Sequence, residues 1–282
     1  KPQVSVIIPT LGRETLYPLI DNLLEQKTSF QYEIVLIPQI KLNPLPKNKR
    51  IKVYFEEPGK GFAYYRNVGI KKSQADILAF IDDDEMPMNE KWLSIITESI
   101  RKGKESVTTA GVYIKLEEDY LTNSISLLGF PGGGAIGFRI MWYVDKNNYT
   151  EHLCSGNLSI TKKILKEVDN FSSDFKHGNE DVNLADKLIK QNIKIKYVEA
   201  ATVYHVSRKG FNNFIKWNIL RGKSATEYLK NNKKTGKVGN RFSSSLKILT
   251  KVTKSKPFYL PGVLFVMINQ YAWQVFGYLI KN

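Results

Sequence analysis

An apolar run that ends abruptly in acidic residues most constrains how this chain can fold. Residues Ile77–Ile81 are all apolar, and three aspartates and a glutamate, Asp82–Glu85, follow directly. The run is typical of a parallel strand buried on both faces, and ligands bind at the carboxyl ends of such strands. Because adjacent carboxylates repel each other, the cluster favours a nearby cation or a metal held by phosphate. Taken alone, the segment also fits an acidic loop or the start of a helix.

Strands and helices alternate through residues 1–105. Apolar, β-branched runs predict strands, and apolar residues spaced three and four apart predict helices. The predicted strands are Val4–Thr10, Tyr32–Ile37, Ile51–Phe55 and Ile77–Ile81, and the predicted helices are Thr15–Lys27, Phe62–Lys72 and Trp92–Ile100. This alternation predicts an α/β fold with a mostly parallel, doubly wound sheet.

The pattern is less regular in residues 106–208, which predicts a small, mixed second half. Leu127–Trp142 contains Pro131 followed by three glycines, so we expect no stiff element there. Such a segment is either a lid or binding loop, or a plain surface excursion. The predicted strands of this half are Val107–Leu116, Leu158–Ile160, Ile193–Val198 and Ala201–His205, and its predicted helices are Lys162–Val168 and Glu180–Gln191.

The last part of the chain predicts helices. Phe211–Lys230 has the pattern of a long helix with a basic face, and a basic, polar linker follows at Lys230–Lys237. Tyr259–Ile280 carries no charged residue across its 22 positions, although Pro261 and Gln270 interrupt its apolar character. Three interpretations stay open: a helix lying at a membrane surface, a core or dimer-forming helix, and a helix that spans the membrane.

The chain is strongly basic. It has 42 lysines and arginines against 27 aspartates and glutamates, a formal net charge of +15. Such an excess favours anionic partners, namely nucleotides, lipid phosphates, acidic membrane surfaces or nucleic acid, and it also serves solubility.

Cysteine usage and the first residues bear on the compartment. Cys154 is the one cysteine, so no intrachain disulfide can form, as fits a reducing compartment. The apolar run Val4–Ile8 is too short for the hydrophobic region of a secretory signal. We therefore expect a cytoplasmic protein, peripheral at the cytoplasmic face of the membrane.

Four motifs occur in a fixed order. VSVIIPT (residues 4–10) is followed by Arg13, then by GKGFAYYRNVGIKKSQADILAFIDDDE (59–85), then by CSGNLSITKKIL (154–165) with NEDVNLADKL (179–188), and last by YHV (204–206). This order resembles glycosyltransferase family 2, the inverting GT-A enzymes, over residues 3–208. The most specific part is Arg66-Asn67 sixteen residues upstream of the acidic cluster, because a lone DxD motif is a weak signal.

The resemblance implies the fold and the activity. It implies a GT-A type α/β fold with a catalytic domain at 1–208, divided into a nucleotide-sugar half at 1–105 and an acceptor half at 106–208. Residues 209–282 then form a helical C-terminal extension, for which association with a membrane is one interpretation. The implied function is inverting, metal-dependent transfer of a hexose from a nucleoside diphosphate sugar to an acceptor hydroxyl. The acceptor is a lipid-linked saccharide or a glycan, which would place the enzyme in glycan biosynthesis.

The chemistry of sugar transfer assigns roles to these residues. The departing diphosphate needs neutralisation, which a divalent cation held by oxygen ligands supplies, and the acceptor hydroxyl needs a base. Asp82 and Asp84 alternate along the backbone and can face one ion. The predicted metal ligands are Asp84, Asp82 and His205, for Mn²⁺ or Mg²⁺. The resemblance places the base in the Glu180–Asp181 pair, with Asp181 as base and Glu180 orienting either Asp181 or the acceptor.

The remaining predicted contacts belong to the two substrates. The donor-binding residues are Pro9, Thr10, Arg13, Gly59, Lys60, Gly61, Arg66, Asp82, Asp83 and Arg208, and the acceptor-binding residues are Gly156 and Asn157. Structural alternatives stay open for several of these: the acidic pair also fits a helix start capped by Asn179, and His205 also fits a packed strand-edge side chain. The basic side chains also fit a solvated surface.

The sequence departs from the family pattern in two places. The second strand ends at Gln39, where the family has an acid for the nucleotide base, and Val168–Phe171 replaces the usual Gly-Gly-Phe-Asp. A nucleotidyltransferase is disfavoured, because residues 10–13 hold only one glycine. A nucleic-acid-binding protein is disfavoured because most basic residues are lysines spread along helices, so we expect no nucleic acid partner. A sugar or nucleotide sensor would bind the donor without turnover.

Overall fold

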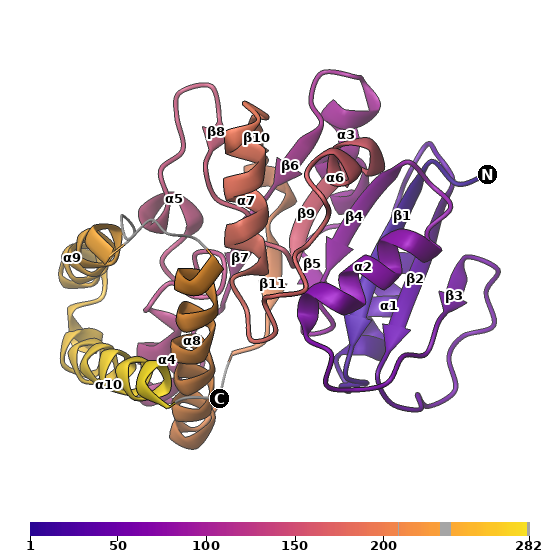
Figure 1. The fold of residues 1–282 in the computed structure, drawn as a ribbon. Helices are drawn as coiled ribbons and strands as arrows, with labels where there is room; N and C mark the ends of the chain where they lie inside the picture. Colours follow the sequence, from indigo (N-terminus) through magenta and orange to yellow (C-terminus); the bar gives the residue numbers. More distant parts are fainter. Residues whose placement is uncertain (208, 232–237, 281–282) are drawn as a thin grey trace. The chain divides into compact units, whose positions relative to one another are not determined.

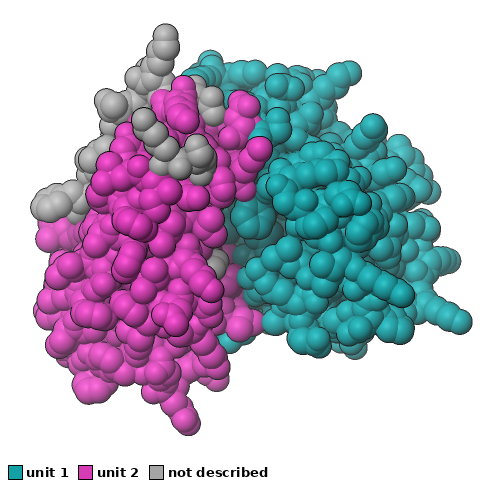
Figure 2. All heavy atoms as spheres, turned by 60° about the horizontal axis from the view of Figure 1, so that its bottom comes forward, with its two compact units in different colours: residues 1–111, 144–173, 180–204 teal, residues 112–143, 174–179, 205–282 magenta. Residues whose placement is uncertain are grey.

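The computed structural model describes residues 1–207, 209–231 and 238–280 (Figure 1). The chain divides into two compact units, coloured separately in Figure 2. Unit 1 comprises residues 1–111, 144–173 and 180–204, and unit 2 comprises residues 112–143, 174–179 and 205–282. The predicted boundary at residue 208 stays a prediction, since these units are interleaved in sequence. Part of the predicted linker at 230–237 lies outside the described residues.

Unit 1 is built on an eight-stranded sheet. Its order is β3-β2-β1-β4-β9-β6-β10-β8. The strands are β1 (Val4–Thr10), β2 (Tyr32–Pro38), β3 (Ile51–Val53), β4 (Ile77–Ile81), β6 (Val107–Thr109), β8 (Tyr149–Thr150), β9 (Asn157–Thr161) and β10 (Ile195–Tyr197). The four strands β3, β2, β1 and β4 are parallel, which confirms the mostly parallel sheet predicted from the βα alternation.

Strand β9 changes the direction of the sheet. It runs antiparallel to β4 and to β6, with Ile81 opposite Asn157. Because β9 runs against β4, its first residue meets the last residue of β4. The loop before β9 therefore approaches the acidic residues that follow β4. The short strands β5 (Glu85–Pro87) and β11 (Val203–His205) pair in a second, small sheet.

Helices cover both faces of the unit 1 sheet. They are α1 (Leu16–Leu24), α2 (Phe62–Lys72), α3 (Trp92–Arg101), α6 (Lys162–Glu167) and α7 (Glu180–Lys190), with the short 3₁₀ helix η1 (Glu199–Ala201). Residues Ile7, Phe80, Leu184 and others join one core cluster that unites α2, α6 and α7 with the sheet. Helix α2 lies so close to β1 that a Cβ at Gly69 would collide with Ile7. This close packing fixes the second half of α2 against β1.

Unit 2 is mainly helical. Its helices are α4 (Tyr120–Ser126), α5 (Phe138–Met141), α8 (Phe211–Asn231), α9 (Val238–Ser255) and α10 (Leu260–Leu279), with the 3₁₀ turn η2 (Pro257–Tyr259) and the short strand β7 (Val112–Tyr113). Their apolar residues, among them Leu127, Phe214, Val252 and Val266, form a core cluster of their own. The segment predicted to lack a stiff element holds only the single turn α5, and Leu128 and Met141 are buried in this core.

Helices α8 and α10 cross at very short range. A Cβ at Gly222 would collide with the backbone of α10, and a Cβ at Gly277 would collide with the backbone of α8 at Ile219. Nearby, the Asn218 side chain accepts a hydrogen bond of 2.9 Å from Gln274. Glycine is required on both sides because any side chain would hold the two helices apart.

Helix α10 answers part of the question left open for Tyr259–Ile280. One face, including Val263, Val266 and Gln270, is buried in unit 2, so the core-helix interpretation holds for that face. The opposite face is exposed. Within the described residues, the structure has no helix long and apolar enough to cross a membrane.

Candidate active site

Six carboxyl groups gather at the carboxyl end of β4 in unit 1. We call this set the acidic edge: Asp82, Asp83, Asp84, Glu85, Glu180 and Asp181. The first four follow β4 directly, and the last two begin α7. Their environments differ sharply, because Asp82 and Asp84 are partly exposed whereas Asp83, Glu85 and Glu180 are buried.

Asp83 holds the loop that follows β1. Its carboxylate accepts hydrogen bonds from the Thr10 hydroxyl (2.6 Å) and the Leu11 amide (3.0 Å), and it pairs with the Arg13 guanidinium. The Thr15 hydroxyl donates to the Asp83 carbonyl oxygen at 2.6 Å. Burial raises the pKa of Asp83, while Arg13 and the Thr10 hydroxyl counteract the rise. Asp83 therefore positions the loop that carries Thr10 and Arg13, and its predicted donor contact stays a prediction.

Arg66 connects the strand end with the start of α7. Its guanidinium lies 2.8 Å from Asp82 Oδ1 and 2.8 Å from Glu180 Oε1, and its side chain is only 2% exposed. Burial lowers the pKa of Arg66, but the charges of Asp82 and Glu180 outweigh burial, so the pKa is raised. Among the described residues, its Nε has no hydrogen-bond partner. This cation therefore ties two carboxylates together, and its burial favours positioning over direct contact with the donor.

Asn67 fixes the next part of the chain. Its side-chain amide donates to the Phe171 carbonyl oxygen at 2.7 Å and accepts from the Phe171 amide at 3.2 Å. Phe171 lies in the segment between α6 and α7 and packs edge to face on Phe80 of β4. The Arg66-Asn67 pair thus fixes the approach to α7 through charge and through backbone hydrogen bonds.

Glu180 and Asp181 differ in access. Glu180 is buried, paired with Arg66, and accepts from the Ser155 hydroxyl at 3.3 Å. Asp181 is partly exposed, and its Oδ1 accepts from the Val182 amide at 2.7 Å. A base must reach its substrate, so the geometry favours Asp181 over Glu180 for that role.

Glu85 is the acidic residue that sequence reasoning left without a role. It is buried, and its Oε2 accepts from the Asp82 amide at 3.2 Å. Burial, followed by the charges of Asp82 and Asp84, raises its pKa well above the ordinary value. A Cβ at Gly156 would lie 2.6 Å from both carboxylate oxygens, so glycine is required there by the close approach of Glu85. The sequence alone does not reveal this contact between Glu85 and Gly156, because it depends on the antiparallel pairing of β9 with β4.

Two further residues of this loop are buried beside Glu85. The Asn157 side chain accepts from Trp92 Nε1 at 3.1 Å and donates to the Gly111 and Ala201 carbonyl oxygens at 2.9 and 2.8 Å. These bonds favour a role for Asn157 in fixing this part of the chain. The predicted contact of Asn157 with the acceptor stays a prediction. Burial, followed by the charges of Glu85 and Asp181, raises the pKa of Cys154 well above the ordinary value, so this thiol is protonated at neutral pH.

The predicted donor loop precedes α2. Gly59 and Gly61 both have φ near 87°, a conformation that favours glycine, and Gly61 directly precedes the helix. Lys60 between them is exposed, with its Nζ 3.3 Å from Glu56 and 3.1 Å from the Tyr64 hydroxyl. The loop follows the parallel strand β3, and Pro9 is the second-last residue of the parallel strand β1, so both lie at the edge where the acidic residues gather.

The acidic edge suits a divalent cation. Arg13 pairs with Asp83 and, at 3.1 Å, with Asp84, while Arg66 pairs with Asp82 and Glu180. Two guanidinium groups thus lie among six carboxyl groups, and burial, followed by the charges of Asp82 and Asp84, raises the pKa of Glu85. Carboxylate oxygens are the ligands that Mg²⁺ and Mn²⁺ prefer. In the described part of the chain no three His, Cys, Asp or Glu side chains converge as a complete metal site.

His205 and Arg208 were predicted from the motif that ends in YHV. His205 belongs to unit 2 and is buried, with Nδ1 2.6 Å from the Val206 carbonyl oxygen. A carbonyl oxygen only accepts, so Nδ1 donates the hydrogen bond. Its place in a metal site stays a prediction. Arg208 lies outside the described residues.

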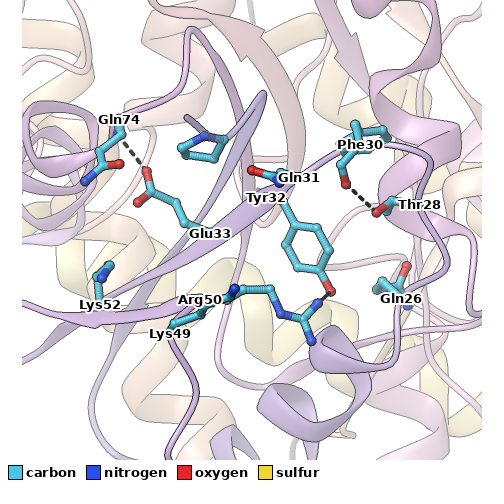
Figure 3. A pocket seen from close by; sticks show the side chains of 11 residues that line it. Gln26, Thr28, Phe30, Gln31, Tyr32, Glu33, Lys49, Arg50, Lys52 and Gln74 are labelled. Carbon is cyan, nitrogen blue, oxygen red and sulfur yellow. Dashed lines mark hydrogen bonds between the residues drawn. The ribbon is translucent and has the colours of Figure 1, made fainter.

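A pocket of about 510 Å³ lies at the other edge of the sheet (Figure 3). Its residues include Glu33 and Tyr32 at the start of β2, whereas the acidic edge lies at the strand ends. Glu33 accepts from the Gln74 amide at 2.6 Å, and Arg50 donates to the Tyr32 hydroxyl, as the dashed lines mark. Both polar pairs join neighbouring chain segments, so this pocket is part of the framework and no reacting group is assigned to it.

Comparisons with known proteins give the chain its family. The family model "Glycosyl transferase family 2" matches residues 5–169, more than half of the chain. Two glycosyltransferases of Haemophilus influenzae, both described as uncharacterized, are 34% and 30% identical over 100 and 97 residues. These alignments cover 32% and 33% of this chain and only 39% and 33% of the relatives.

A solved structure has a similar fold over nearly the whole chain. It is a mannosyltransferase from Pyrobaculum calidifontis in complex with GDP-Man and Mn²⁺. The two chains are 15% identical, the TM-score is 0.57, and the match covers 96% of this chain and 76% of the other. At this identity the likeness concerns the fold, and it confirms the predicted GT-A type with its helical C-terminal extension. The family match then gives the conclusion that the chain belongs to glycosyltransferase family 2.

Proposed function

We propose that this protein is an inverting glycosyltransferase that moves a sugar from a nucleoside diphosphate sugar to an acceptor hydroxyl. The observation that carries the proposal is the acidic edge in unit 1. It joins partly exposed carboxylates at the end of β4 to a partly exposed carboxylate at the start of α7 through one buried cation, Arg66. Sugar transfer needs a group that binds the diphosphate of the donor and, beside it, a base for the acceptor hydroxyl.

The strand-end half of the acidic edge binds the donor. Asp82 and Asp84 would hold Mn²⁺ or Mg²⁺, with His205 as the proposed third protein ligand. When bound, the ion would neutralise negative charge that develops on the departing diphosphate. Arg13, held by Asp83, lies beside Asp84 and can donate to a phosphate oxygen. The Mn²⁺ and GDP-Man of the mannosyltransferase complex support this class of donor and ion.

The α7 half supplies the base. Asp181 accepts the proton of the acceptor hydroxyl as its oxygen attacks the anomeric carbon, and the nucleoside diphosphate departs from the opposite face. A single displacement of this kind inverts the anomeric configuration. Glu180 stays fixed between Arg66 and Ser155 and holds the first turn of α7, so Asp181 keeps its orientation.

We further propose a membrane-borne acceptor. The acceptor is a lipid-linked saccharide or a glycan, and the protein works as a peripheral protein on the cytoplasmic face of an anionic membrane. The charge-free helix α10 and the flanking lysines support this location. In this proposal residues 1–208 act as the catalytic domain and residues 209–282 as the extension that brings it to the membrane.

A donor screen tests the proposal. Thermal unfolding is measured with UDP-, GDP- and dTDP-sugars, each with Mn²⁺ and with EDTA. We expect one nucleotide class to raise the Tm only when Mn²⁺ is present. The product formed from that donor is then examined by NMR, and an inverted anomeric centre is expected. A Tm that no donor raises, or a product with retained configuration, would contradict the proposal.

A further inference from the structure

Helix α10 exposes an unbroken apolar stripe. The stripe consists of Leu264, Phe265, Ile268, Ala272, Val275, Phe276 and Leu279. These positions recur every three or four residues and therefore share one side of the helix. Ile268 and Leu279 are each 68% exposed. A stripe of this length carries no charged side chain, which is uncommon on a surface that faces only water.

The orientation of α10 is fixed by its other side. Val263, Val266 and Met267 belong to the core of unit 2, and Gln274 bonds Asn218 of α8. The glycine contacts between α8 and α10 leave no room for rotation. The stripe therefore cannot turn inward, and a helix held in this way cannot enter a bilayer end-on without losing its core contacts.

Residues 228–282 carry charged side chains of one sign, all of them basic. After Glu227 the sequence has no further aspartate or glutamate, and α9, which directly precedes η2 and α10, exposes Lys247, Lys251 and Lys254. The basic residues of this acid-free segment are Lys230, Lys233, Lys234, Lys237, Arg241, Lys247, Lys251, Lys254, Lys256 and Lys281. An acid-free basic segment beside an apolar stripe complements an anionic, amphipathic surface.

We propose that the stripe of α10 lies in the interface of an anionic phospholipid bilayer, with the helix parallel to the surface and the α9 lysines near the headgroups. This deepens the proposed function, on which it rests for the membrane-borne acceptor. Electrostatic attraction reaches about a Debye length, roughly 8 Å at physiological salt, so the lysines act without inserting. The apolar side chains supply the part of the affinity that salt does not weaken.

A second copy of the chain is the competing occupant of the stripe. Stripe-to-stripe pairing would bring two acid-free basic segments together, and like charges across an interface oppose association. An anionic bilayer instead attracts the same lysines. The observed charge therefore favours the bilayer.

Vesicle flotation of the full chain tests the proposal. The probes are vesicles of phosphatidylglycerol and phosphatidylcholine in equal parts, and vesicles of phosphatidylcholine alone. Ile268→Glu with Val275→Glu should reduce binding to the mixed vesicles by roughly tenfold or more. The matched control, Val53→Glu with Ile189→Glu, adds the same charge at exposed apolar positions of unit 1 and should bind as the unaltered protein does. Lys247→Gln, Lys251→Gln and Lys254→Gln together should weaken binding most at low salt, by roughly fivefold for each lysine.

Two readouts separate the possible failures. Circular dichroism and donor-induced Tm shifts are recorded for every variant. Loss of flotation with donor binding intact shows that the stripe binds the membrane independently of the donor site. Failure of the unaltered protein to bind any donor would instead count against the proposed function. Flotation unchanged by the Glu pair, or no flotation of the unaltered protein at low salt, would overturn the proposal. A dimer that the Glu pair converts to a monomer with unchanged flotation would assign the stripe to self-association and would also overturn it.

Discussion

The two units break the usual distribution of side chains in opposite ways. In unit 1, charge is buried: Arg66 and Glu180 form an ion pair with almost no solvent contact. In unit 2, apolar surface is exposed: Ile268 and Leu279 of α10 lie open to solvent. Folded proteins ordinarily bury apolar groups and leave charges in water. Each exception carries a free-energy cost, from desolvating ions in unit 1 and from hydrating apolar side chains in unit 2, so each marks a place where stability alone does not explain the residues.

The comparison separates two kinds of function. Buried charge in unit 1 fixes carboxylates for chemistry, because a paired ion in a low-dielectric site holds its neighbours in one geometry. Exposed apolar surface in unit 2 suits contact with another surface, since it is stabilised only when water leaves it. Variants in each unit test these two assignments of function in turn.

Removing the buried cation should have the largest effect. Arg66→Ala leaves Asp82 and Glu180 without their shared partner, and the loss of one member of a buried pair costs about 3–5 kcal/mol. Urea unfolding measures this. Lys102→Ala, which breaks the exposed pair with Glu98, is the control and should cost under about 0.5 kcal/mol. Equal effects in the two variants would erase the contrast between buried and surface charge.

Removing the base should leave the fold intact and stop the reaction. Asp181→Asn cannot accept the hydroxyl proton, so kcat should fall by roughly a hundredfold or more. The Tm should stay close to that of the unaltered protein, because Asp181 is partly exposed. Near-normal kcat in this variant would move the base role to another carboxylate, with Glu180 the next to test.

Adding a single methyl group where α8 and α10 cross should destabilise unit 2. Gly277→Ala drives a Cβ into the backbone of α8, and overpacking of this kind costs about 1–3 kcal/mol. Val275→Ala, on the exposed side of the same helix, should cost under about 0.5 kcal/mol. If Gly277→Ala stabilised the protein, as alanine does at an open helical position, the crossing of α8 and α10 would have to be looser than described.

Glu85 should give unit 1 a measurable pH dependence. Its raised pKa means that the folded state binds the proton more tightly than the unfolded state does, and this stability is complete below the ordinary carboxyl pKa. As pH rises through the raised pKa, the free energy of unfolding should fall. Urea unfolding in EDTA across this range should show a smaller slope for Glu85→Gln. The same slope in both proteins would contradict the cause assigned here.

Local sequence pattern was enough to predict several strands and helices of unit 1. The predicted limits of β1 and β4 agree with the structure, and Phe62–Lys72 is α2. Those segments combine β-branched runs or helical spacing with clear stop signals. The predicted helix Thr15–Lys27 is shorter in the structure, Leu16–Leu24, since its ends lie in turns. Helix α9 was not predicted, because its serines, threonines and valines have weak helical preference.

The roles of individual side chains were harder to predict than the limits of the helices and strands. Arg66 pairs with Glu180 across 114 positions of sequence, and Asp83 accepts from Thr10 across 73. No local pattern reveals which of several neighbouring acids faces the interior, because that depends on how α2, β4 and β9 pack. The sequence placed Arg66 among phosphate contacts, whereas the structure shows a buried link between two carboxylates. For α10, only packing distinguished the buried face from the exposed one.

One measurement tests the central claim most directly, namely that the acidic edge divides into a donor half and a catalytic half. Titration calorimetry with Mn²⁺ and the nucleoside diphosphate chosen by the donor screen is performed on the unaltered protein, Asp84→Asn and Asp181→Asn. Asp84→Asn should weaken binding by roughly tenfold or more, since it removes a charged metal ligand, while Asp181→Asn should bind with unchanged Kd. Full affinity in Asp84→Asn, or an equal loss in both variants, would contradict the division.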